Sequence, residues 1–192
     1  NNAGVALAKS AWETTLADWE WVLGVNLYGV IHGIRAFVPR MLEKGEEGHI
    51  VNTASVAGLV SQPAMAAYNV SKFGVVTLTE GLHHDLTLRK TRLKASVLCP
   101  GWVKTRIAES DRHREADERT DPRQLDAVSA KTGLSMFKAV QQGIAPEQVA
   151  DDVFAAVENE KFYILTHPET KAGVHVRKED ILKERPPTLL PV

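Results

Sequence analysis

Apolar residues recur at every third or fourth position between residues 12 and 44, with polar residues between them. This spacing predicts an amphipathic helix over the stretch. Gly24 and Gly29 flank Asn26 within it, so a break or a kink is expected near Asn26. Further glycines just beyond residue 44 predict the end of the helix.

The rest of the chain divides into short apolar runs and longer amphipathic stretches, separated by Gly, Pro and charged residues. Pro63 is well placed to open a second long helix, since its fixed φ suits a first helical turn. The predicted elements are strands at 49–53, 94–99 and 162–166 and helices at 63–89, 125–142 and 146–158. Strands separated by helices long enough to cross over predict a parallel α/β sheet.

Three strands are few for 192 residues. A doubly wound sheet normally also has a first half, which carries a Gly-rich turn for phosphate. No G-x-G-x-x-G or similar turn opens a helix in this chain. We therefore predict a single domain over 1–192 with an incomplete doubly wound, Rossmann-type parallel sheet, whose first βαβαβ half is absent.

Composition excludes several classes of function. Hydrophobic residues make up 44% and charged residues 24%, as in an ordinary globular domain, and the net charge of -1 argues against a nucleic-acid partner. No apolar run reaches the roughly 18 residues that a membrane span needs, so no membrane partner is expected. The single cysteine, Cys99, rules out an internal disulfide framework and favours a reducing, cytoplasmic location.

The strongest chemical signal is Tyr68-Asn69-Val70-Ser71-Lys72. Residues four apart on a helix share one face, so the side chains of Tyr68 and Lys72 are expected side by side. A free tyrosine has a pKa near 10, and a nearby ammonium favours the phenolate. Lys72 is therefore expected to lower the pKa of Tyr68, which could then serve as a general acid or base. A Tyr-x-x-x-Lys pair without further context is more often structural.

Other motifs supply that context. Ser55 lies in a loop of small residues directly after a predicted strand and 13 residues before Tyr68. In this order the chain resembles the short-chain dehydrogenase/reductase family, closely over residues 1 to about 110 and more loosely over 145–166. The motifs that carry the resemblance are Asn1-Asn2-Ala3-Gly4, Asn26 within Val25-Asn26-Leu27-Tyr28-Gly29, Ile50-Val51-Asn52-Thr53-Ala54-Ser55, Tyr68 with Lys72, and Pro100-Gly101-Trp102-Val103-Lys104-Thr105.

The resemblance implies an NAD- or NADP-dependent oxidoreductase that interconverts a secondary alcohol and a ketone. Tyr68 would exchange the proton with the substrate oxygen, and Ser55 would hydrogen-bond that oxygen. Lys72 would lower the pKa of Tyr68 and hold the nicotinamide ribose. Asn26 would anchor a water that links Lys72 to solvent. The implied cofactor-binding residues are Asn2, Ala3, Gly4, Tyr68, Lys72, Pro100, Gly101, Val103 and Thr105, with Gly101 leaving room for the nicotinamide.

In the family, the Asn-Asn-Ala-Gly motif follows a cofactor-binding half, and the strand that ends at Asn2 lies beside the strand at 49–53. This chain starts at the motif. The resemblance thus implies a C-terminal portion that lacks the diphosphate loop and the residue that selects NAD or NADP. The alternative is a non-catalytic remnant, or a fragment that depends on a partner chain.

The segment at 106–142 corresponds to the family's variable substrate lid. It begins highly charged, so we expect it to be solvated and mobile without ligand. It ends with Leu134, Met136, Phe137 and Val140, of which Leu134, Met136 and Phe137 would turn toward the site and favour a hydrophobic substrate. A Pro-rich loose tail is expected at 184–192, and the family implies a homo-oligomer formed through helices near 27–44 and 63–90.

Simpler interpretations exist for several of these residues. Thr105 could only cap a helix, and Trp102 is more often a packing residue than a substrate contact. A serine hydrolase built on Ser55 is disfavoured, because Thr53 and Ala57 stand where a nucleophile elbow has glycines. No metal is expected, since adjacent His83 and His84 point about 100° apart on a helix.

Overall fold

The structure is a computed structural model that describes residues 1–190. Strands β1 (Gly48–Thr53), β2 (Leu93–Leu98) and β3 (Tyr163–Ile164) form a parallel sheet in the order β1-β2-β3. β1 and β2 pair along their full length, whereas β3 pairs through two residues and is shorter than the predicted strand at 162–166. The parallel α/β architecture is confirmed.

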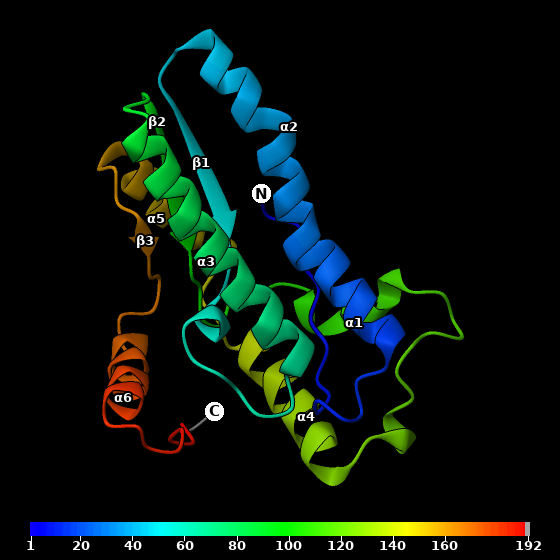
Figure 1. Cartoon of the computed structure of the whole chain (residues 1–192). Helices are drawn as coiled ribbons and strands as arrows, with labels where there is room; N and C mark the ends of the chain where they lie inside the picture. Colours follow the sequence, from blue (N-terminus) through cyan, green and yellow to red (C-terminus); the bar gives the residue numbers. More distant parts are fainter. Residues whose placement is uncertain (191–192) are drawn as a thin grey trace.

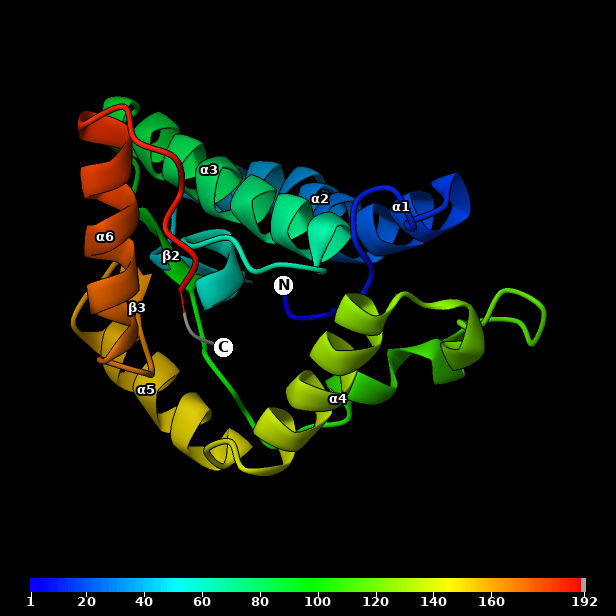
Figure 2. The same ribbon diagram turned by 90° about the horizontal axis from the view of Figure 1, so that it is seen from below.

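Helices cover both faces of the sheet (Figures 1 and 2). They are α1 (Leu16–Leu23), α2 (Gly29–Lys44), α3 (Ala66–Leu88), α4 (Ala127–Gln141), α5 (Pro146–Glu158) and α6 (Thr170–Leu182), with 3₁₀ segments at Val56–Gly58, Ile107–His113 and Pro122–Gln124. α2 and α3 lie side by side on one face, where Val30 and Val75 pack with Val97 of β2. α5 packs on the other face, where Ala156 meets Leu98 and Ile164. The apolar sheet is thus buried from both sides, as a doubly wound fold requires.

The first long helix begins at Leu16 rather than near residue 12. Thr15 caps it, because its hydroxyl accepts the backbone N–H of Asp18 while the Asp18 carboxylate accepts the N–H of Thr15. At Gly24–Tyr28 the backbone forms a π-turn and then continues as α2. The expected irregularity near Asn26 is therefore present, as a widened turn instead of a break.

The helix formed by Leu16–Lys44 is 29 residues long and, by length and composition alone, apolar enough to cross a membrane, although no uninterrupted apolar run marks it in the sequence. Val22 and Asn26 are nevertheless completely buried within the fold. Val22 packs in the core, and Asn26 is buried with its side chain hydrogen-bonded to Val5 and Ser71.

Two further boundaries differ from the sequence predictions. α3 begins at Ala66, not at Pro63, since Ala64 adopts a left-handed conformation with φ of 50°. α6 was not predicted, because among its residues Asp180 alone is buried and no apolar stripe marks the helix. The expected tail from residue 184 has no regular secondary structure through residue 190, but Arg185 and Thr188 both bond Asp180. Residues 191 and 192 lie outside the described part.

Asn1 lies along the outer edge of β1. Its amino group donates to the Val51 carbonyl oxygen at 2.9 Å, and its own carbonyl accepts the Thr53 N–H at 2.9 Å. Its side-chain amide donates to Asn52, and Asn52 donates in turn to the Thr79 hydroxyl on α3. The expected position of the first motif beside the strand at 49–53 is confirmed by these contacts, which bring Asn2 and Gly4 to the carboxyl end of the sheet.

The charged segment that follows β2 is less solvated than expected. Ser110 and Arg114 are buried. The Arg114 guanidinium bonds the Asp18 carboxylate at 2.6 Å and stacks over the ring of Trp21 at 4.8 Å from its centroid. Sequence charge alone predicted a solvated face, but a buried acid on α1 provides a partner for one of its arginines.

Candidate active site

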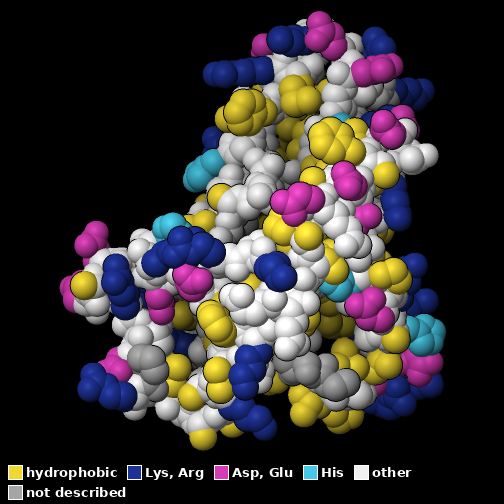
Figure 3. Space-filling model, turned by 180° about the vertical axis from the view of Figure 1, so that it is seen from behind, with side chains coloured by type: hydrophobic (Ala, Val, Ile, Leu, Met, Phe, Trp, Pro, Cys, Tyr) yellow, Lys and Arg dark blue, Asp and Glu magenta, His cyan; other side chains and the backbone are white. Residues whose placement is uncertain are grey.

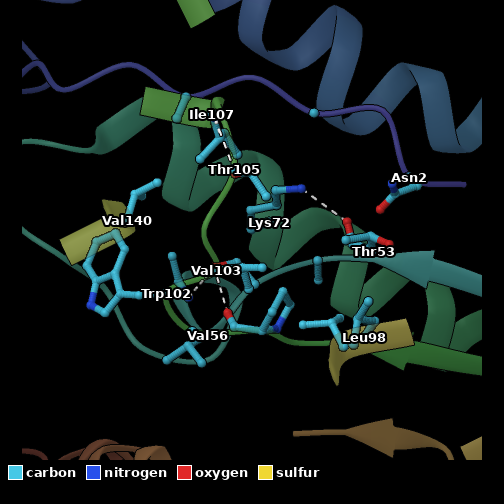
Figure 4. Close-up of a pocket in the computed structure, with 18 of the residues that line it drawn as sticks. Asn2, Thr53, Val56, Lys72, Leu98, Trp102, Val103, Thr105, Ile107 and Val140 are labelled. Carbon is cyan, nitrogen blue, oxygen red and sulfur yellow. Dashed lines mark hydrogen bonds between the residues drawn. The ribbon is translucent and has the colours of Figure 1, made fainter. Parts of the chain in front are cut away.

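A cavity of about 870 Å³ opens at the carboxyl ends of β1 and β2. Ligands of open parallel sheets bind at this edge, because the connections that follow the strands diverge there. Ser55, Tyr68 and Lys72 line the cavity together with Asn2 and Gly4. Figure 4 shows Lys72 pointing to the Thr53 carbonyl oxygen, with Trp102, Val103 and Thr105 along the segment that follows β2. The predicted motifs therefore meet in one place.

Tyr68 and Lys72 lie one turn apart on α3, as predicted. Both are buried, and the Lys72 ammonium nitrogen lies 5.6 Å from the centroid of the Tyr68 ring. The Lys72 Nζ donates to the Thr53 carbonyl oxygen at 3.0 Å. Burial lowers the pKa of Lys72 to about 8, because a desolvated ammonium loses hydration. The group thus remains mostly charged at neutral pH while lying close to its titration range.

The expectation that Lys72 lowers the pKa of Tyr68 is not met. Burial raises the pKa of Tyr68, and a hydrogen bond with the Ser55 side chain opposes that shift without reversing it. The loss of hydration around the phenolate is the larger effect, and Lys72 directs its ammonium to Thr53 rather than to the phenol. In this state Tyr68 is a protonated phenol, which is the form that a general acid needs.

Ser55 is positioned at the end of the β1 connection. Its Oγ accepts the Ala57 N–H at 3.1 Å, which caps the short 3₁₀ segment, and donates to the Pro100 carbonyl oxygen at 3.4 Å. Val56 donates its N–H to that same Pro100 oxygen at 2.9 Å. The hydroxyl is therefore fixed between the loops after β1 and β2, beside Tyr68.

Asn26 is fully buried in the π-turn and is not among the residues that line the cavity. Its Oδ1 accepts the Val5 N–H at 2.8 Å, while its Nδ2 donates to the Val5 carbonyl at 2.9 Å and to the Ser71 hydroxyl at 3.0 Å. A Cβ placed on Gly4 would lie 3.7 Å from this Oδ1 and 3.6 Å from Lys72 Nζ. Asn26 thus joins the first segment to α3 directly behind Lys72.

Eight of the nine predicted cofactor-binding residues line the cavity, and Ala3 does not. Besides Tyr68 and Lys72, the lining residues are Asn2, Gly4, Pro100, Gly101, Val103 and Thr105. Thr105 also accepts the Ile107 N–H at 3.3 Å, although the N-cap of the 3₁₀ segment that begins at Ile107 is Arg106. A Cβ on Gly101 would lie 2.8 Å from the ring of His167, so the space beside Gly101 is filled by that ring.

The lid segment contributes fewer apolar groups than expected. Met136 and Val140 are buried and line the cavity. Leu134 and Phe137 are exposed and are not among the lining residues, so the expectation that both turn toward the site is wrong. The turn of α4 explains this split, because residues four apart share one helix face while their immediate neighbours do not.

His167 is a site residue that sequence reasoning missed. It follows β3 and lines the cavity, with its ring nitrogens bonded to the backbone at Gly101 and Trp102. A lone histidine after a short strand carries no recognisable spacing, so no sequence signal could have identified it. Cys99 at the end of β2 does not line the cavity; it is a buried free thiol whose pKa burial raises to about 12.

Within residues 1–190, no three His, Cys, Asp or Glu side chains come together as a metal-binding group. On the face shown in Figure 3, basic and acidic side chains are interspersed rather than separated by sign.

Comparison with known proteins gives a consistent result. The family model described as short chain dehydrogenase matches residues 1–116. The chain is 35% identical over 189 residues to the CLA biosynthesis dehydrogenase/reductase of Lactiplantibacillus plantarum, covering 97% of this chain and 66% of that protein. It is 33% identical over 183 residues to a C alpha-dehydrogenase of a Sphingobium species, covering 95% of this chain and 58% of that protein.

A solved structure agrees closely with the fold. The short chain dehydrogenase/reductase from Burkholderia phymatum, determined in complex with NAD, superposes with a TM-score of 0.92 at 44% identity, over 100% of this chain and 68% of that one. The chain thus spans about three fifths to two thirds of the length of these relatives. With the family model matched over more than half of its residues, the chain belongs to the short-chain dehydrogenase/reductase family.

Proposed function

We propose that this chain carries the catalytic part of an NAD- or NADP-dependent oxidoreductase that interconverts a secondary alcohol and a ketone. The observation that carries the proposal is the convergence of Ser55, Tyr68 and Lys72 on one cavity at the carboxyl end of the parallel sheet. The NAD bound to the Burkholderia relative supports the choice of cofactor.

The residues on the cavity wall fit the nicotinamide end of such a cofactor. An ammonium has three donors, and Thr53 O is the one acceptor that Lys72 finds among the described residues. Its remaining donors suit the hydroxyls of the nicotinamide ribose, and the Val103 backbone suits the carboxamide. The bound cofactor would accept or supply the hydride.

The chain's own residues would handle the proton. Tyr68 is a buried phenol beside the Ser55 hydroxyl, so the two can hold a carbonyl oxygen from adjacent donors. During reduction Tyr68 would give its proton to that oxygen, and Ser55 would stabilise the developing charge. Lys72 would act on the cofactor rather than on the phenol, because its ammonium is directed to the Thr53 carbonyl oxygen and not to Tyr68.

Asn26 has a positioning role in this proposal. Its side-chain amide is occupied by Val5 and Ser71, so it fixes the segment that carries Gly4 against α3. Ser71 in turn donates to the Tyr68 carbonyl at 2.7 Å. The π-turn that contains Asn26 would provide the backbone site for a water that links Lys72 to solvent, since π-turns interrupt the regular helical hydrogen bonding.

We propose a hydrophobic substrate class, a lid at 106–142 and a homo-oligomer in the cytoplasm. Met136 and Val140 support an apolar substrate wall.

The large exposed side chains Phe37 on α2 and Leu88 on α3 support an interface along these helices. This oligomer is proposed for the complete protein, so sedimentation of the fusion described below tests it over a concentration range, and a purely monomeric fusion would contradict it.

The test of the function uses two proteins. One is the 192-residue chain; the other joins it to the segment of the Burkholderia relative that precedes the residue aligned with Asn1. Because these residues contain no Gly-rich diphosphate turn, we expect tight NAD binding and ketone reduction in the fusion and only weak cofactor binding in the chain itself. Calorimetric titration and the absorbance of the reduced cofactor measure both.

Ser55→Ala in the fusion is the matched variant. It should lower turnover of a secondary alcohol or ketone by about 10²-fold, because one of two donors to the substrate oxygen is lost, while cofactor affinity stays unchanged. A folded fusion that binds NAD but turns over no secondary alcohol or ketone would overturn the proposed reaction.

A further inference from the structure

His167 lies in the loop after β3, 66 residues beyond the Gly101 backbone that it contacts. Its side chain is part of the cavity wall and is aimed at the turn that follows β2. That turn carries Gly101, Trp102 and Val103, which enclose one side of the cavity (Figure 4). A histidine at this position therefore links the last strand to the part of the wall that faces the ligand.

Both ring nitrogens have backbone partners. Nδ1 accepts the Gly101 N–H at 3.1 Å and lies 2.8 Å from the Thr166 hydroxyl, and Nε2 lies 3.1 Å from the Trp102 carbonyl oxygen. Because Nδ1 accepts from a backbone N–H, the ring proton of the neutral imidazole must reside on Nε2, where it can donate to Trp102. In this tautomer the Gly101 N–H and the Thr166 hydroxyl share the single lone pair of Nδ1.

The same turn is held from a second direction. The Ile144 N–H donates to the Trp102 carbonyl at 3.0 Å, and the Lys104 N–H donates to the Ile144 carbonyl at 2.9 Å. Val103 and Ile144 form an isolated parallel bridge between these bonds. The Trp102 carbonyl thus receives donors from both the connection between α4 and α5 and His167, while the Gly101 N–H depends on His167.

Packing restricts the turn in addition to hydrogen bonding. A Cβ on Gly101 would lie 2.8 Å from His167 Cγ, which is closer than real Cβ contacts allow. The imidazole therefore rests against the bare Cα of Gly101. Ring and glycine together leave the turn little freedom to move toward β3.

We propose that His167 is a positioning residue, which fixes the Gly101–Val103 turn in the conformation that lines the cavity. Its value for function rests on the proposed oxidoreductase activity, in which the Val103 backbone binds the nicotinamide carboxamide. Through this turn His167 sets the affinity for the cofactor's nicotinamide end, and it does not exchange protons with the substrate.

The first test needs no cofactor and uses the chain itself. Nitrogen NMR of the ¹⁵N-histidine-labelled protein should show His167 as the Nε2–H tautomer, with Nδ1 unprotonated. Amide hydrogen exchange should then become at least about tenfold faster at Gly101 in His167→Ala, because its acceptor is removed. His175→Ala, a change at an exposed histidine of α6, is the control and should leave this exchange unchanged. An Nδ1–H tautomer, or unchanged exchange in His167→Ala, would overturn the proposal.

Rescue separates hydrogen bonding from space filling. His167→Asn keeps an acceptor near the position of Nδ1 and should restore most of the protection at Gly101. His167→Phe fills the space without polar atoms and should behave like His167→Ala. Equal protection of the Gly101 amide in the Phe and Asn variants would contradict the proposed hydrogen bond and would show that His167 acts by packing alone.

The last experiment tests whether the positioning of the turn by His167 affects cofactor binding. In the fusion described above, His167→Ala should weaken NAD binding by about tenfold and change kcat by less than about threefold, because the wall moves while Tyr68 and Ser55 stay in place. Unchanged NAD affinity would overturn the positioning role. If the wild-type fusion binds no NAD while His167 shows the expected tautomer and Gly101 the expected amide exchange, the proposed function is contradicted. The positioning of the Gly101–Val103 turn by His167 would still be supported.

Discussion

The region that ends at Thr105 and the segment at 106–142 differ in how completely their buried polar groups are hydrogen-bonded. In the first region, fully buried polar side chains such as Asn26, Asn52 and Thr79 have partners on neighbouring regular elements. Among the described residues, buried polar atoms without a hydrogen-bond partner are those of Gln62 and Asn69 in the first region and those of Asp111, Arg114 and Thr120 in the much shorter second one. Paired polar groups fix one conformation, whereas unpaired ones favour local opening. Because the unpaired atoms are denser in the segment at 106–142, we expect that segment to be more adaptable than the region that holds the candidate site.

The largest effect on this contrast is expected at Asp18, the contact that ties the segment to the region that holds the candidate site. Its carboxylate bonds Arg114 and Lys9, each at less than 3 Å. Asp18→Asn leaves the buried guanidinium of Arg114 without its nearest charged partner, since Asp111 and Glu118 lie farther away at 3.8 and 4.0 Å, and should cost about 3–5 kcal/mol of unfolding free energy. Asp85→Asn, in the exposed pair with Arg89, is the control and should cost less than about 0.5 kcal/mol. Denaturant titration measures both, and equal losses would remove the contrast.

The pH dependence of the Asp18 contact has a definite sign. Burial acts to raise the pKa of Asp18, but bonds from Lys9, Arg114 and Thr15 hold it below its usual value. The contact therefore stabilises the chain above the ordinary pKa of aspartate, and this stability is lost as pH falls through the lowered value. The difference between wild type and Asp18→Asn should shrink in acid.

A smaller effect is expected at Lys72, inside the region that holds the candidate site. Its pKa is lowered from 10.5 to about 8 by burial, so the unfolded chain holds a proton that the folded chain releases between these values. Wild-type stability from this group rises as pH increases from 8 to 10.5. Lys72→Met should therefore be more stable than wild type by on the order of 2–3 kcal/mol at neutral pH, with the advantage shrinking above pH 8.

The control for this measurement is Lys131→Met, at an exposed lysine of α4. It should change the unfolding free energy by less than about 0.5 kcal/mol at every pH. If Lys72→Met lowered the unfolding free energy at neutral pH, Lys72 would be a stabilising residue. That result would contradict the interpretation that the buried Lys72 charge lowers stability and is kept for function.

The smallest effect is expected on the lid, and it concerns selectivity. Met136 lines the cavity and Phe137 does not. Met136→Ala should change the preference between bulky and small ketones by about 5- to 10-fold in kcat/KM, since one apolar contact in a pocket is worth about 1 kcal/mol of discrimination at the low end. Phe137→Ala should leave the order unchanged. Identical substrate profiles for the two variants would show that this segment packs without selecting substrate.

Much of the region that holds the candidate site could be predicted from the sequence, because its signals are local. The spacing of Tyr68 and Lys72 placed both on one helix face, and Ser55 followed a short apolar strand. The parallel sheet followed from strands separated by long helices. The kink at Asn26 followed from the flanking glycines, although its form as a π-turn did not.

The remainder depends on contacts between distant residues. Arg114 bonds Asp18 across a separation of 96 residues, and His167 bonds Gly101 across a separation of 66 residues. Separations this long follow no local spacing rule that a sequence pattern could reveal. The raised pKa of Tyr68 depends on burial, which no local pattern reports. α6 lacks an apolar stripe and was missed for that reason.

The central claim is that Ser55, Tyr68 and Lys72 form one proton-transfer site. Tyr68→Phe in the NAD-binding fusion tests it most directly, because the change removes the phenolic oxygen and keeps the ring that packs in the cavity. We predict that ketone reduction falls by about 10³-fold while NAD affinity, measured by calorimetry, changes by less than about threefold. Turnover within about tenfold of wild type in a folded Tyr68→Phe protein would contradict the account.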